Sequence, residues 1–448
     1  MSELPTGWGF SSLLDIVNLH DSRRIPLNQK QRAERQGEYP YYGANGQVDS
    51  IDDFIFDGNY ILLAEDGGYF DNPSKGVAYE VSGQFWVNNH AHILSPCGEI
   101  PIRFLSYVLN SLDWMPYVGG STRLKLTQES MRRVLIPLPP LNEQRRIVAK
   151  LDRLFARSRC AREELGQVSG LVQRYKQAVL ATAFRGDLTA DWREENNLPK
   201  SSILRSTIND PYKHDFFAPE HWKSYYLVQV CKFIGGSQPP KSMFSYTPKP
   251  GYLRLIQIRD YKSDAFITYV PRESVRRFCS AADVMIGRYG PPIFQILRGI
   301  EGAYNVALMK AEANLEITSK KFIYYYLQNP DLFNYVDVSS DRTAGQSGVN
   351  KAHLEKYPVF MPPLEEQTVI VQIIEKLFKA IDFMEQEHQQ ASKLLDRLEQ
   401  ATLSKAFRGE LVPQDPNDEP AAVLLERIQS DRQAQPKGKA IKSKQSHC

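Results

Sequence analysis

The residues whose types and spacing could support catalysis are few in this sequence. Asn209-Asp210-Pro211-Tyr212 partly matches the Asn/Asp-Pro-Pro-Tyr/Phe motif of amino-methyltransferases, but the second proline is missing and no glycine-rich cofactor loop accompanies it. The sequence also has no GxxxxGK[ST] phosphate-binding loop and no GxGxxG after a predicted strand. We therefore expect a turn at residues 209–212, no catalytic residues and no bound cofactor in this chain.

One short motif has the spacing of metal ligands. Residues 88–92, Asn-Asn-His-Ala-His, place two histidines in a His-x-His pattern, but no third ligand is evident nearby. The motif predicts a polar recognition or packing strand and no metal site. The cysteines are scattered and form no CxxC pair, which favours a reduced, cytoplasmic protein. They are Cys97, Cys160, Cys231, Cys279 and Cys448.

Several glycine-rich loops carry residue types that suit contact with nucleic acid. Asn and Gln can pair with adenine edges, Arg can pair with guanine, and flexible basic loops suit phosphate contact. A basic loop recurs just before the last predicted strand of each globular segment, at residues 119–125 and 341–351. The candidate DNA-binding residues are Tyr42, Asn45, Asn89, His90, Arg123 and Lys125 in the first half, and Arg288, Tyr289, Arg342, Gln346 and Lys351 in the second.

The elements that must position these loops are revealed by an internal repeat. Residues 139–188 and 362–411 align without a gap at an offset of 223 residues, with about 22 identities in about 50 positions. Each copy opens with Pro-Pro-Leu-x-Glu-Gln and closes with Ala-Phe-Arg-Gly-Asp/Glu-Leu. Proline before the first turn and glycine after the last predict one long helix per copy.

The apolar residues of each predicted helix step by four and three, which is typical of a coiled coil. The first seam runs from Ile147 to Val179 and includes Ser158 and Tyr175, and the second runs from Ile370 to Thr402 and includes Met384, His388 and Leu398. Two matching seams favour an antiparallel pair with a pseudo-two-fold axis and with the globular segments at opposite ends.

Residues that the two helix copies share outside the seam predict two equivalent surfaces for two copies of one partner. The candidates for partner binding are Glu143, Gln144, Arg174 and Gln177, and Glu366, Gln367, Arg397 and Gln400.

Two globular segments precede the helices. They open alike, with Trp8 and Trp222, and close alike, but they differ almost completely between these borders. Short runs broken by Gly, Pro, Asn and Asp predict strands. We expect an α+β fold with two strand-rich target-recognition domains separated by two long helices in an antiparallel coiled coil. The expected boundaries are 1–138 and 196–361 for the domains, 139–195 and 362–428 for the helical spacers, and 429–448 for a basic disordered tail.

Composition and charge exclude some classes of protein. The 448 residues are 42% hydrophobic and 24% charged, and the formal net charge of +3 is too small to indicate nucleic-acid binding by itself. Any basic surface must therefore be local. No apolar stretch approaches the ~20 residues that span a bilayer, so we expect no membrane partner.

The order of variable domain and repeated helix resembles the specificity subunit of Type I restriction-modification systems over nearly the whole chain. Residues 39–46, 62–68 and 85–94 resemble one kind of target-recognition domain in that family, and 283–292 with 298–310 resemble another. The resemblance implies that each domain recognises one half of an asymmetric, interrupted double-stranded DNA site and that the helices set the spacing.

The resemblance also implies the partners. Two modification subunits carry S-adenosylmethionine and methylate adenine N6, and two restriction subunits complete the nuclease. The alternative from the residues alone is a coiled-coil interaction scaffold whose end domains bind protein or glycan.

Overall fold

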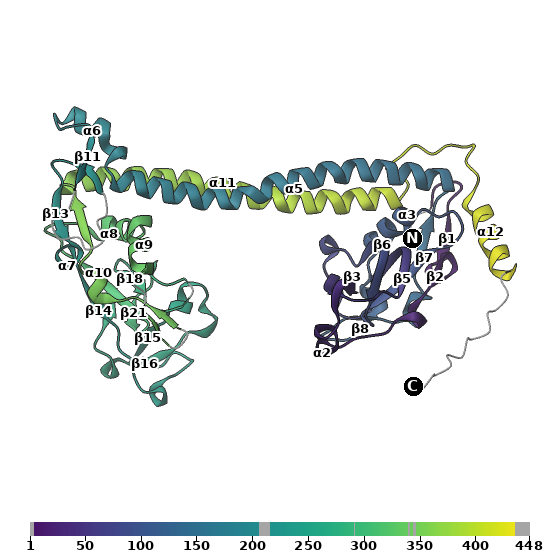
Figure 1. Cartoon of the computed structure of the whole chain (residues 1–448), viewed down its shortest axis with the longest axis horizontal. Coiled ribbons are helices and arrows are strands. Elements are labelled where there is room, and N and C mark those ends of the chain that lie inside the picture. Colours follow the sequence, from purple (N-terminus) through teal and green to yellow (C-terminus); the bar gives the residue numbers. More distant parts are fainter. Residues whose placement is uncertain (1–3, 206–215, 291, 339–340, 344–345, 435–448) are drawn as a thin grey trace. The chain divides into compact units, whose positions relative to one another are not determined.

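The computed structural model describes residues 4–205, 216–290, 292–338, 341–343 and 346–434 (Figure 1). The motif at 209–212 lies outside the described residues. Contacts divide the chain into two compact units: unit 1 comprises Met1–Gly166 and Gln389–Cys448, and unit 2 comprises Gln167–His388. Among the described residues, no helix is both long enough and apolar enough to cross a bilayer.

Unit 1 is built on a six-stranded sheet in the order β2-β7-β5-β6-β3-β4. Its central strand β5 (Phe56–Ala64) ends in the apolar run Ile61–Ala64, which is fully buried because side chains cover both faces of the sheet. The helix α3 (Ile102–Ser111) packs against this sheet through Phe104, Leu105, Val108 and Leu109, which share one helix face. The other strands are β2 (Val17–Leu19), β3 (Gln36–Gly43), β4 (Gly46–Ile51), β6 (Ala78–Val87) and β7 (Ala91–Pro96).

Smaller elements complete the globular part of unit 1. β1 (Gly9–Ser12) pairs antiparallel with β10 (Leu135–Leu138), so the first and last strands of the domain lie together beside the long helix that follows. The remaining elements are α1 (Leu13–Ile16), α2 (Gln29–Ala33), β8 (Val118–Gly119), β9 (Lys125–Leu126) and α4 (Gln128–Met131).

In unit 2 the first and last strands of the domain pair as they do in unit 1, but the sheets between them are different. β13 (Lys223–Tyr226) pairs with β24 (Pro358–Met361), as β1 pairs with β10. Between them lie two four-stranded sheets, β14-β21-β18-β19 and β16-β15-β20-β17. Their strands are β14 (Cys231–Gly235), β15 (Tyr252–Ile256), β16 (Tyr269–Pro271), β17 (Phe278–Cys279), β18 (Val284–Gly287), β19 (Gln295–Leu297), β20 (Gly302–Tyr304) and β21 (Leu308–Ala313). The other elements are α6 (Ala190–Glu195), β11 (Ser202–Arg205), β12 (Phe216–Pro219), α7 (Leu227–Val230), α8 (Lys320–Tyr326), α9 (Pro330–Val338), β22 (Asp341–Thr343), β23 (Gln346–Gly348) and α10 (Lys351–Leu354).

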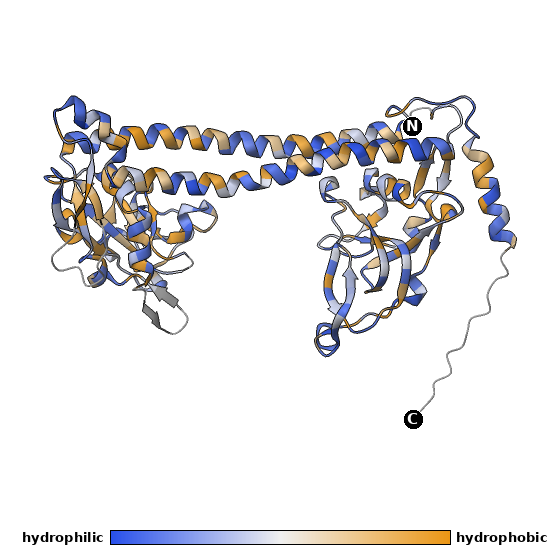
Figure 2. Ribbon diagram, turned by 45° about the horizontal axis from the view of Figure 1, so that its top comes forward, coloured by the Kyte–Doolittle hydropathy of each residue, from blue (hydrophilic) through white to orange (hydrophobic). Residues whose placement is uncertain are grey.

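The two long helices are α5 (Leu141–Phe184) and α11 (Leu364–Phe407), and both contain hydrophilic and hydrophobic residues along their whole length (Figure 2). They pack together with opposite directions. Within unit 1, Arg162 contacts Asp396 at 2.8 Å and Glu399 at 3.0 Å. Within unit 2, Lys176 contacts Asp382 at 2.7 Å. The predicted fold class, with its antiparallel coiled coil, is therefore confirmed.

Both helices end where glycine was expected to end them. Gly186 and Gly409 adopt left-handed φ angles of 86° and 77°, which favour glycine. A Cβ atom at Gly186 would overlap the ring of Pro219, and one at Gly409 would overlap the ring of Pro5. Each helix end thus packs against the proline that opens a globular domain.

The prediction that Tyr175, Met384 and Leu398 lie in the seam is wrong. Their side chains are 59%, 52% and 60% exposed. A straight α-helix drifts by about 20° per heptad relative to an exact seven-residue repeat. The side of each helix that packs against the other helix therefore shifts to the next residue along the sequence. The side chains of Lys176, Glu385 and Glu399 are half-buried there.

The Glu-Gln pair at the start of each helix is buried, which corrects the prediction that Glu143, Gln144, Glu366 and Gln367 bind a partner. These side chains are at most 1% exposed. The indole Nε1 of Trp8 donates to Glu143 Oε2 at 3.0 Å, and that of Trp222 donates to Glu366 Oε2 at 2.9 Å. The glutamine amides donate to the carbonyls of Pro139 and Pro362, at 2.9 Å in both copies. The four side chains therefore fasten each domain to its helix.

The C-terminal helix α12 (Ala421–Ala434) extends beyond residue 428, where the disordered tail was expected to begin. Its Leu424 and Ile428 are buried in unit 1. The Arg432 guanidinium donates to the carbonyls of Leu14 at 2.9 Å and Val17 at 2.6 Å. These contacts order residues 429–434 as helix, and the remainder of the predicted tail, 435–448, lies outside the described residues.

The two buried glutamates should respond differently to loss of charge. In unit 2, Glu366 contacts the fully buried Arg193 at 3.2 Å and His221 at 2.7 Å. In unit 1, burial raises the pKa of Glu143 above its ordinary value, and Glu143 Oε1 has no hydrogen-bond partner. We expect Glu366→Gln to destabilise unit 2 by about 3–5 kcal/mol because it leaves a buried charge unpaired.

The matched variant Glu143→Gln should change the stability of unit 1 by less than about 1 kcal/mol, since the indole keeps an acceptor and no buried ion pair is broken. Native-state hydrogen exchange in β5 and β18 measures the two units separately. Equal losses of stability in both variants would contradict this assignment.

Candidate nucleic-acid interface

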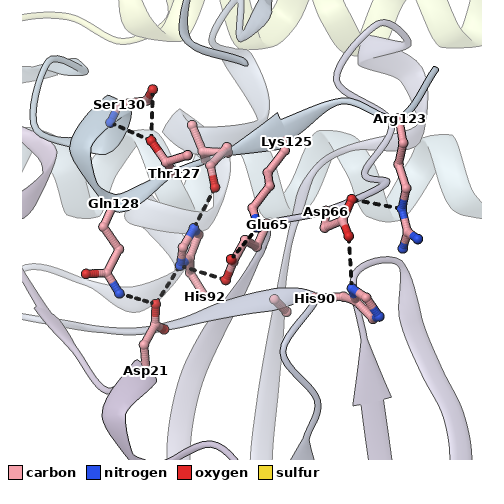
Figure 3. Close-up of polar contacts among 12 residues, drawn as sticks. Asp21, Glu65, Asp66, His90, His92, Arg123, Lys125, Thr127, Gln128 and Ser130 are labelled. Atoms are coloured by element: carbon pink, nitrogen blue, oxygen red, sulfur yellow. Dashed lines mark hydrogen bonds and ion pairs between the residues drawn. The ribbon is translucent and has the colours of Figure 1, made fainter. Parts of the chain in front are cut away.

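The loops predicted to recognise DNA in unit 1 converge on residues 65–67. Figure 3 shows His90, Arg123 and Lys125 beside Glu65 and Asp66. The basic loop at residues 119–125, called the exit loop below together with its counterpart at 341–351, is joined to this segment by backbone hydrogen bonds. These run from Gly67 N to Leu124 O at 2.9 Å and, just after the loop, from Leu126 N to Glu65 O at 2.8 Å. The β3–β4 hairpin joins it through Asn45, whose side-chain amide donates to Gly67 O at 3.0 Å. Loops that are far apart in the sequence therefore meet at one place.

Acidic side chains at this junction hold the predicted basic residues. Asp66 contacts Arg123 Nε at 2.8 Å and His90 Nδ1 at 3.3 Å, and Lys125 lies 3.6 Å from Glu65. The Arg123 and Lys125 side chains remain 58% and 54% exposed. The structure thus presents two cations at the surface, with their orientation set by carboxylates that sequence reasoning did not select.

The other two predicted residues of unit 1 have different environments. Tyr42 is half-buried, and its ring lies 6.0 Å from that of Tyr79 and 5.8 Å from that of Phe85. Packing therefore accounts for Tyr42 without DNA contact. Asn89 is exposed next to His90, where a side-chain amide is accessible.

Beneath the junction lies a buried polar network centred on His92. Its Nδ1 is 2.6 Å from Asp21 Oδ2 and its Nε2 is 3.0 Å from the carbonyl oxygen of Leu126 (Figure 3). Gln128 also donates to Asp21 Oδ2, at 2.8 Å. This network connects β7, the strand that follows the turn containing His90, to the residues after the exit loop. Asp21 lies far from these loops in sequence, and no local pattern identifies it.

The carboxylates of Asp21 and Glu65 and the ring of His92 are close enough to be considered as metal ligands. Protein groups already satisfy these atoms. The Arg24 guanidinium lies 2.6 Å from Glu65 and 3.3 Å from Asp21, and both nitrogens of His92 face oxygen acceptors. The residues therefore fit a structural ion-pair network better than a metal site.

In unit 2 the corresponding loops also meet. A β-bridge joins Tyr289 to Gly348 of the β22–β23 hairpin, and Val349 N donates to Arg288 O at 3.0 Å. The Arg288 guanidinium lies 5.2 Å from the Tyr289 ring centroid. Lys351 is exposed and contacts Glu355 at 3.4 Å. The side chains of Arg342 and Gln346 lie outside the described residues, although their backbone forms the hairpin.

The two junctions occupy equivalent positions in the repeat. In unit 1 a β-bridge joins Asp66 to Lys125, and in unit 2 one joins Tyr289 to Gly348. Asp66 and Tyr289 are 223 residues apart, as are Lys125 and Gly348. The correspondence between the two exit loops is therefore structural, while the side chains at each place differ.

The network around Asp21 should make the stability of unit 1 depend on pH. Burial alone would raise the pKa of Asp21, but the hydrogen bond and charge of His92, the amide of Ile93 and Arg24 hold it below its ordinary value of 3.8. Ionised Asp21 therefore stabilises unit 1 above pH 3.8, and this contribution is lost as the pH falls through the lower folded-state pKa.

We expect Asp21→Asn to lower the free energy of unfolding of unit 1 by roughly 3 kcal/mol at pH 7. The difference from the wild type should shrink below pH 3.8. Denaturation measured from pH 2 to 7 tests this, and Asp71→Asn, at an exposed carboxylate, is the control. A difference that stays constant down to pH 2 would contradict it.

Comparisons with known proteins show which family this chain resembles. The family described as Type I restriction modification DNA specificity domain matches residues 5–168 and 219–393. The EcoDI specificity subunit of Escherichia coli is 25% identical over 99% of both chains. The EcoKI specificity subunit of Escherichia coli K12 is 27% identical over 73% of this chain and 70% of its own.

A chain solved in a study of complex assembly and conformational transition of the type I R-M system has a similar fold. Its TM-score is 0.65 at 20% sequence identity, and the match covers 92% of this chain and 100% of that chain. The family match spans most of the chain in two copies, each of which covers a globular part and ends within the long helix that follows it. This chain therefore belongs to the family of Type I restriction-modification DNA specificity subunits.

Proposed function

We propose that each globular domain recognises one half of an asymmetric, interrupted double-stranded DNA site, and that the chain supplies sequence recognition to subunits that carry out the chemistry. The observation that supports this most directly is the pair of equivalent junctions. In both units an exit loop joins a second loop at the same repeat position, with different side chains presented. A shared scaffold with different contact residues suits the recognition of two different half-sites.

Within unit 1 the chemistry of the junction suits DNA. Arg123 and Lys125 can contact phosphates or guanine, and the amides of Asn45 and Asn89 can contact base edges. In unit 2 the exposed Tyr289 and Lys351 lie at the corresponding junction and would contact DNA there. Family membership does not favour the alternative of a scaffold that binds protein or glycan.

The long helices supply two equivalent surfaces for a partner. Leu171 and Tyr175 on α5 are exposed, and so are Leu394 and Leu398 on α11, each pair 223 residues from the other. The shared Arg174 and Arg397 lie between these apolar side chains and are exposed, as is Gln177, whereas Gln400 is half-buried. Exposed apolar patches favour protein contact. Two copies of one methyltransferase subunit would therefore bind, one on each helix.

The methyltransferase subunits would bind S-adenosylmethionine and transfer its methyl group to adenine N6, and two restriction subunits would complete the complex. This chain would contribute binding energy and orientation, with no catalytic residue. Cytoplasmic location remains a prediction.

The exit loop of unit 1 provides the first test. Arg123→Ala with Lys125→Ala should weaken DNA binding and reduce the slope of log K against log salt by about one unit per lost phosphate contact. Asp66→Asn is the matched variant, because it removes the carboxylate that holds Arg123 and His90. It should strengthen binding to non-cognate DNA. Fluorescence anisotropy across a salt series measures both, and an unchanged slope would place this loop away from DNA.

The helix patches can be tested separately. Leu171→Asp with Tyr175→Asp should remove one methyltransferase subunit from the assembled complex, and Leu394→Asp with Leu398→Asp should remove the other, because a charge on an apolar patch prevents its burial. Native mass spectrometry counts the subunits. Retention of two subunits when all four residues are replaced would exclude these patches as the docking surface.

Exchange of a domain tests the division of recognition. Residues 20–134 can be replaced by those of another family member, while Cys97, Gly98 and the N-terminal segment, which contact α12, are kept. The methylated motif should change in one half only, as seen by sequencing that detects N6-methyladenine. A change in both halves would contradict independent recognition by the two domains.

A further inference from the structure

The turn between β6 and β7 of unit 1 presents Asn89, one of the residues proposed to contact DNA. The side chain of Asn88 closes this turn, since its Oδ1 accepts a hydrogen bond from His90 N at 2.7 Å. Asn88 N donates to Tyr42 O at 3.0 Å. On the other side of the turn, Glu65 N donates to His90 O at 2.8 Å. Asn89 is the central residue of the turn, and it is exposed.

The turn between β20 and β21 of unit 2 makes the same set of hydrogen bonds. Asn305 Oδ1 accepts from Ala307 N at 3.1 Å. Asn305 N donates to Ile256 O at 3.1 Å. Arg288 N donates to Ala307 O at 2.9 Å. The central residue of this turn is Val306.

The exit loop contacts the same neighbour of the turn in both units. Leu126 N donates to Glu65 O at 2.8 Å, and Val349 N donates to Arg288 O at 3.0 Å. Glu65 and Arg288 are 223 residues apart, as are Leu126 and Val349, so both pairs follow the offset of the repeat. The two turns therefore occupy equivalent places beside the two junctions.

Val306 thus corresponds to Asn89 in its place within the domain. Residues 88–90 and 305–307 have a different offset and lie outside the gapless repeat, so the sequence alone does not pair them. Val306 is 43% exposed. At this place unit 1 presents an amide, whereas unit 2 presents an aliphatic side chain.

The turn that presents Val306 is held by two further contacts. Gly236 packs so closely against it that an added Cβ would lie 2.0 Å from Asn305 O. Arg288 Nη1 lies 3.5 Å from Val306 O. A side chain can discriminate between bases when the backbone that carries it is fixed, because its position does not adjust to a wrong base. The turn therefore suits a role in recognition.

An exposed valine at this place has one apolar counterpart on the edges of the base pairs. In the major groove the base pairs present hydrogen-bonding groups, and thymine alone adds a methyl group, at C5. The minor groove presents no methyl group. Single apolar residues are common on protein surfaces. Val306 differs from these because a turn of the same construction presents Asn89 in unit 1.

We propose that Val306 contacts the 5-methyl group of a thymine in the major groove and makes the half-site of unit 2 specific for thymine at that position. This inference rests on the proposed function, because it takes the junction of unit 2 to recognise DNA. It adds an aliphatic residue to the basic, amide and aromatic residues that the sequence indicated. The corresponding Asn89 contacts a hydrogen-bonding base edge, so the two half-sites differ at this position.

The test begins with selection of the recognised site from random DNA duplexes by the full-length chain. Each thymine of the selected site is then replaced singly by deoxyuridine, which removes only the 5-methyl group. We expect one replacement to weaken binding about fourfold, as the loss of one buried methyl group predicts. Val306→Ala should abolish this difference between thymine and deoxyuridine, whereas Val306→Ile should retain it. Fluorescence anisotropy measures each affinity.

Asn89→Ala is the matched control, because it alters the equivalent turn of unit 1. It should leave the effect of this deoxyuridine unchanged and should relax the preference for one base in the other half-site. Val306 and Asn89 are both exposed, so the variants should retain the wild-type melting temperature.

Two results would overturn the assignment of Val306. One is a selected site in which no single deoxyuridine weakens binding, and the other is an effect of deoxyuridine that Val306→Ala leaves in place. In both cases the selected bipartite site would still support the proposed function. If the full-length chain selects no site at all, the proposed function fails, and this inference fails with it.

Discussion

The hydrogen bond from an indole to a buried glutamate at the start of each long helix is the contact on which the rest of this structure depends. It joins the opening of a domain to the first turn of the helix that leaves it, and the adjacent strand pair closes the domain at the same place. Burial of a carboxylate is costly unless its oxygens are satisfied. In unit 2 Arg193 and His221 satisfy the carboxylate, whereas in unit 1 one oxygen has no partner.

Because this contact is made only by the first and last residues of each domain and by the helix, the sheets between them can differ between the two domains. The border strands, the tryptophan and the glutamate keep the same arrangement in both units, while unit 1 has one six-stranded sheet and unit 2 has two four-stranded sheets. The loops that present basic and amide side chains are attached to these different interiors at equivalent repeat positions. The pairing between the two loops is therefore retained although their side chains differ.

The sequence was sufficient to predict the parts of the fold that local chemistry determines. Proline pairs and glycines mark both ends of each helix, and the repeat identifies the pairing of the helices. It was not sufficient to show which of the residues shared by the two repeat copies are buried. Glu143 and Glu366 are shared because they hold the domains to the helices. Residues that bind a partner at the surface would also be identical in both copies, so the sequence does not distinguish the two cases.

The other differences between the predictions from sequence and the structure arise in three dimensions. The shift of the buried side of each helix away from Tyr175 follows from the drift of a straight α-helix, and the heptad spacing alone does not show whether the helices stay straight or supercoil. Asp66 and Asp21 become important because folding brings them to Arg123 and His92. Asp21 lies in no motif, and Asp66 lies in the segment 62–68, whose family resemblance did not single it out. The candidate loops were predictable from composition, but the carboxylates that orient them were not.

The packing of Gly186 against Pro219 and of Gly409 against Pro5 has a consequence for the connectivity of the chain. The first contact joins residues of one stretch of polypeptide within unit 2, whereas the second, within unit 1, joins the segment after α11 to a residue near the start of the sequence without a covalent link. Each long helix is therefore fixed to the domain that begins at its end in the same way, whether or not the chain is continuous there. A circularly permuted gene, opened between Gly186 and Pro219 and joined at the original termini, would specify the same set of contacts. The order of the two domains along the chain is therefore not constrained by the architecture.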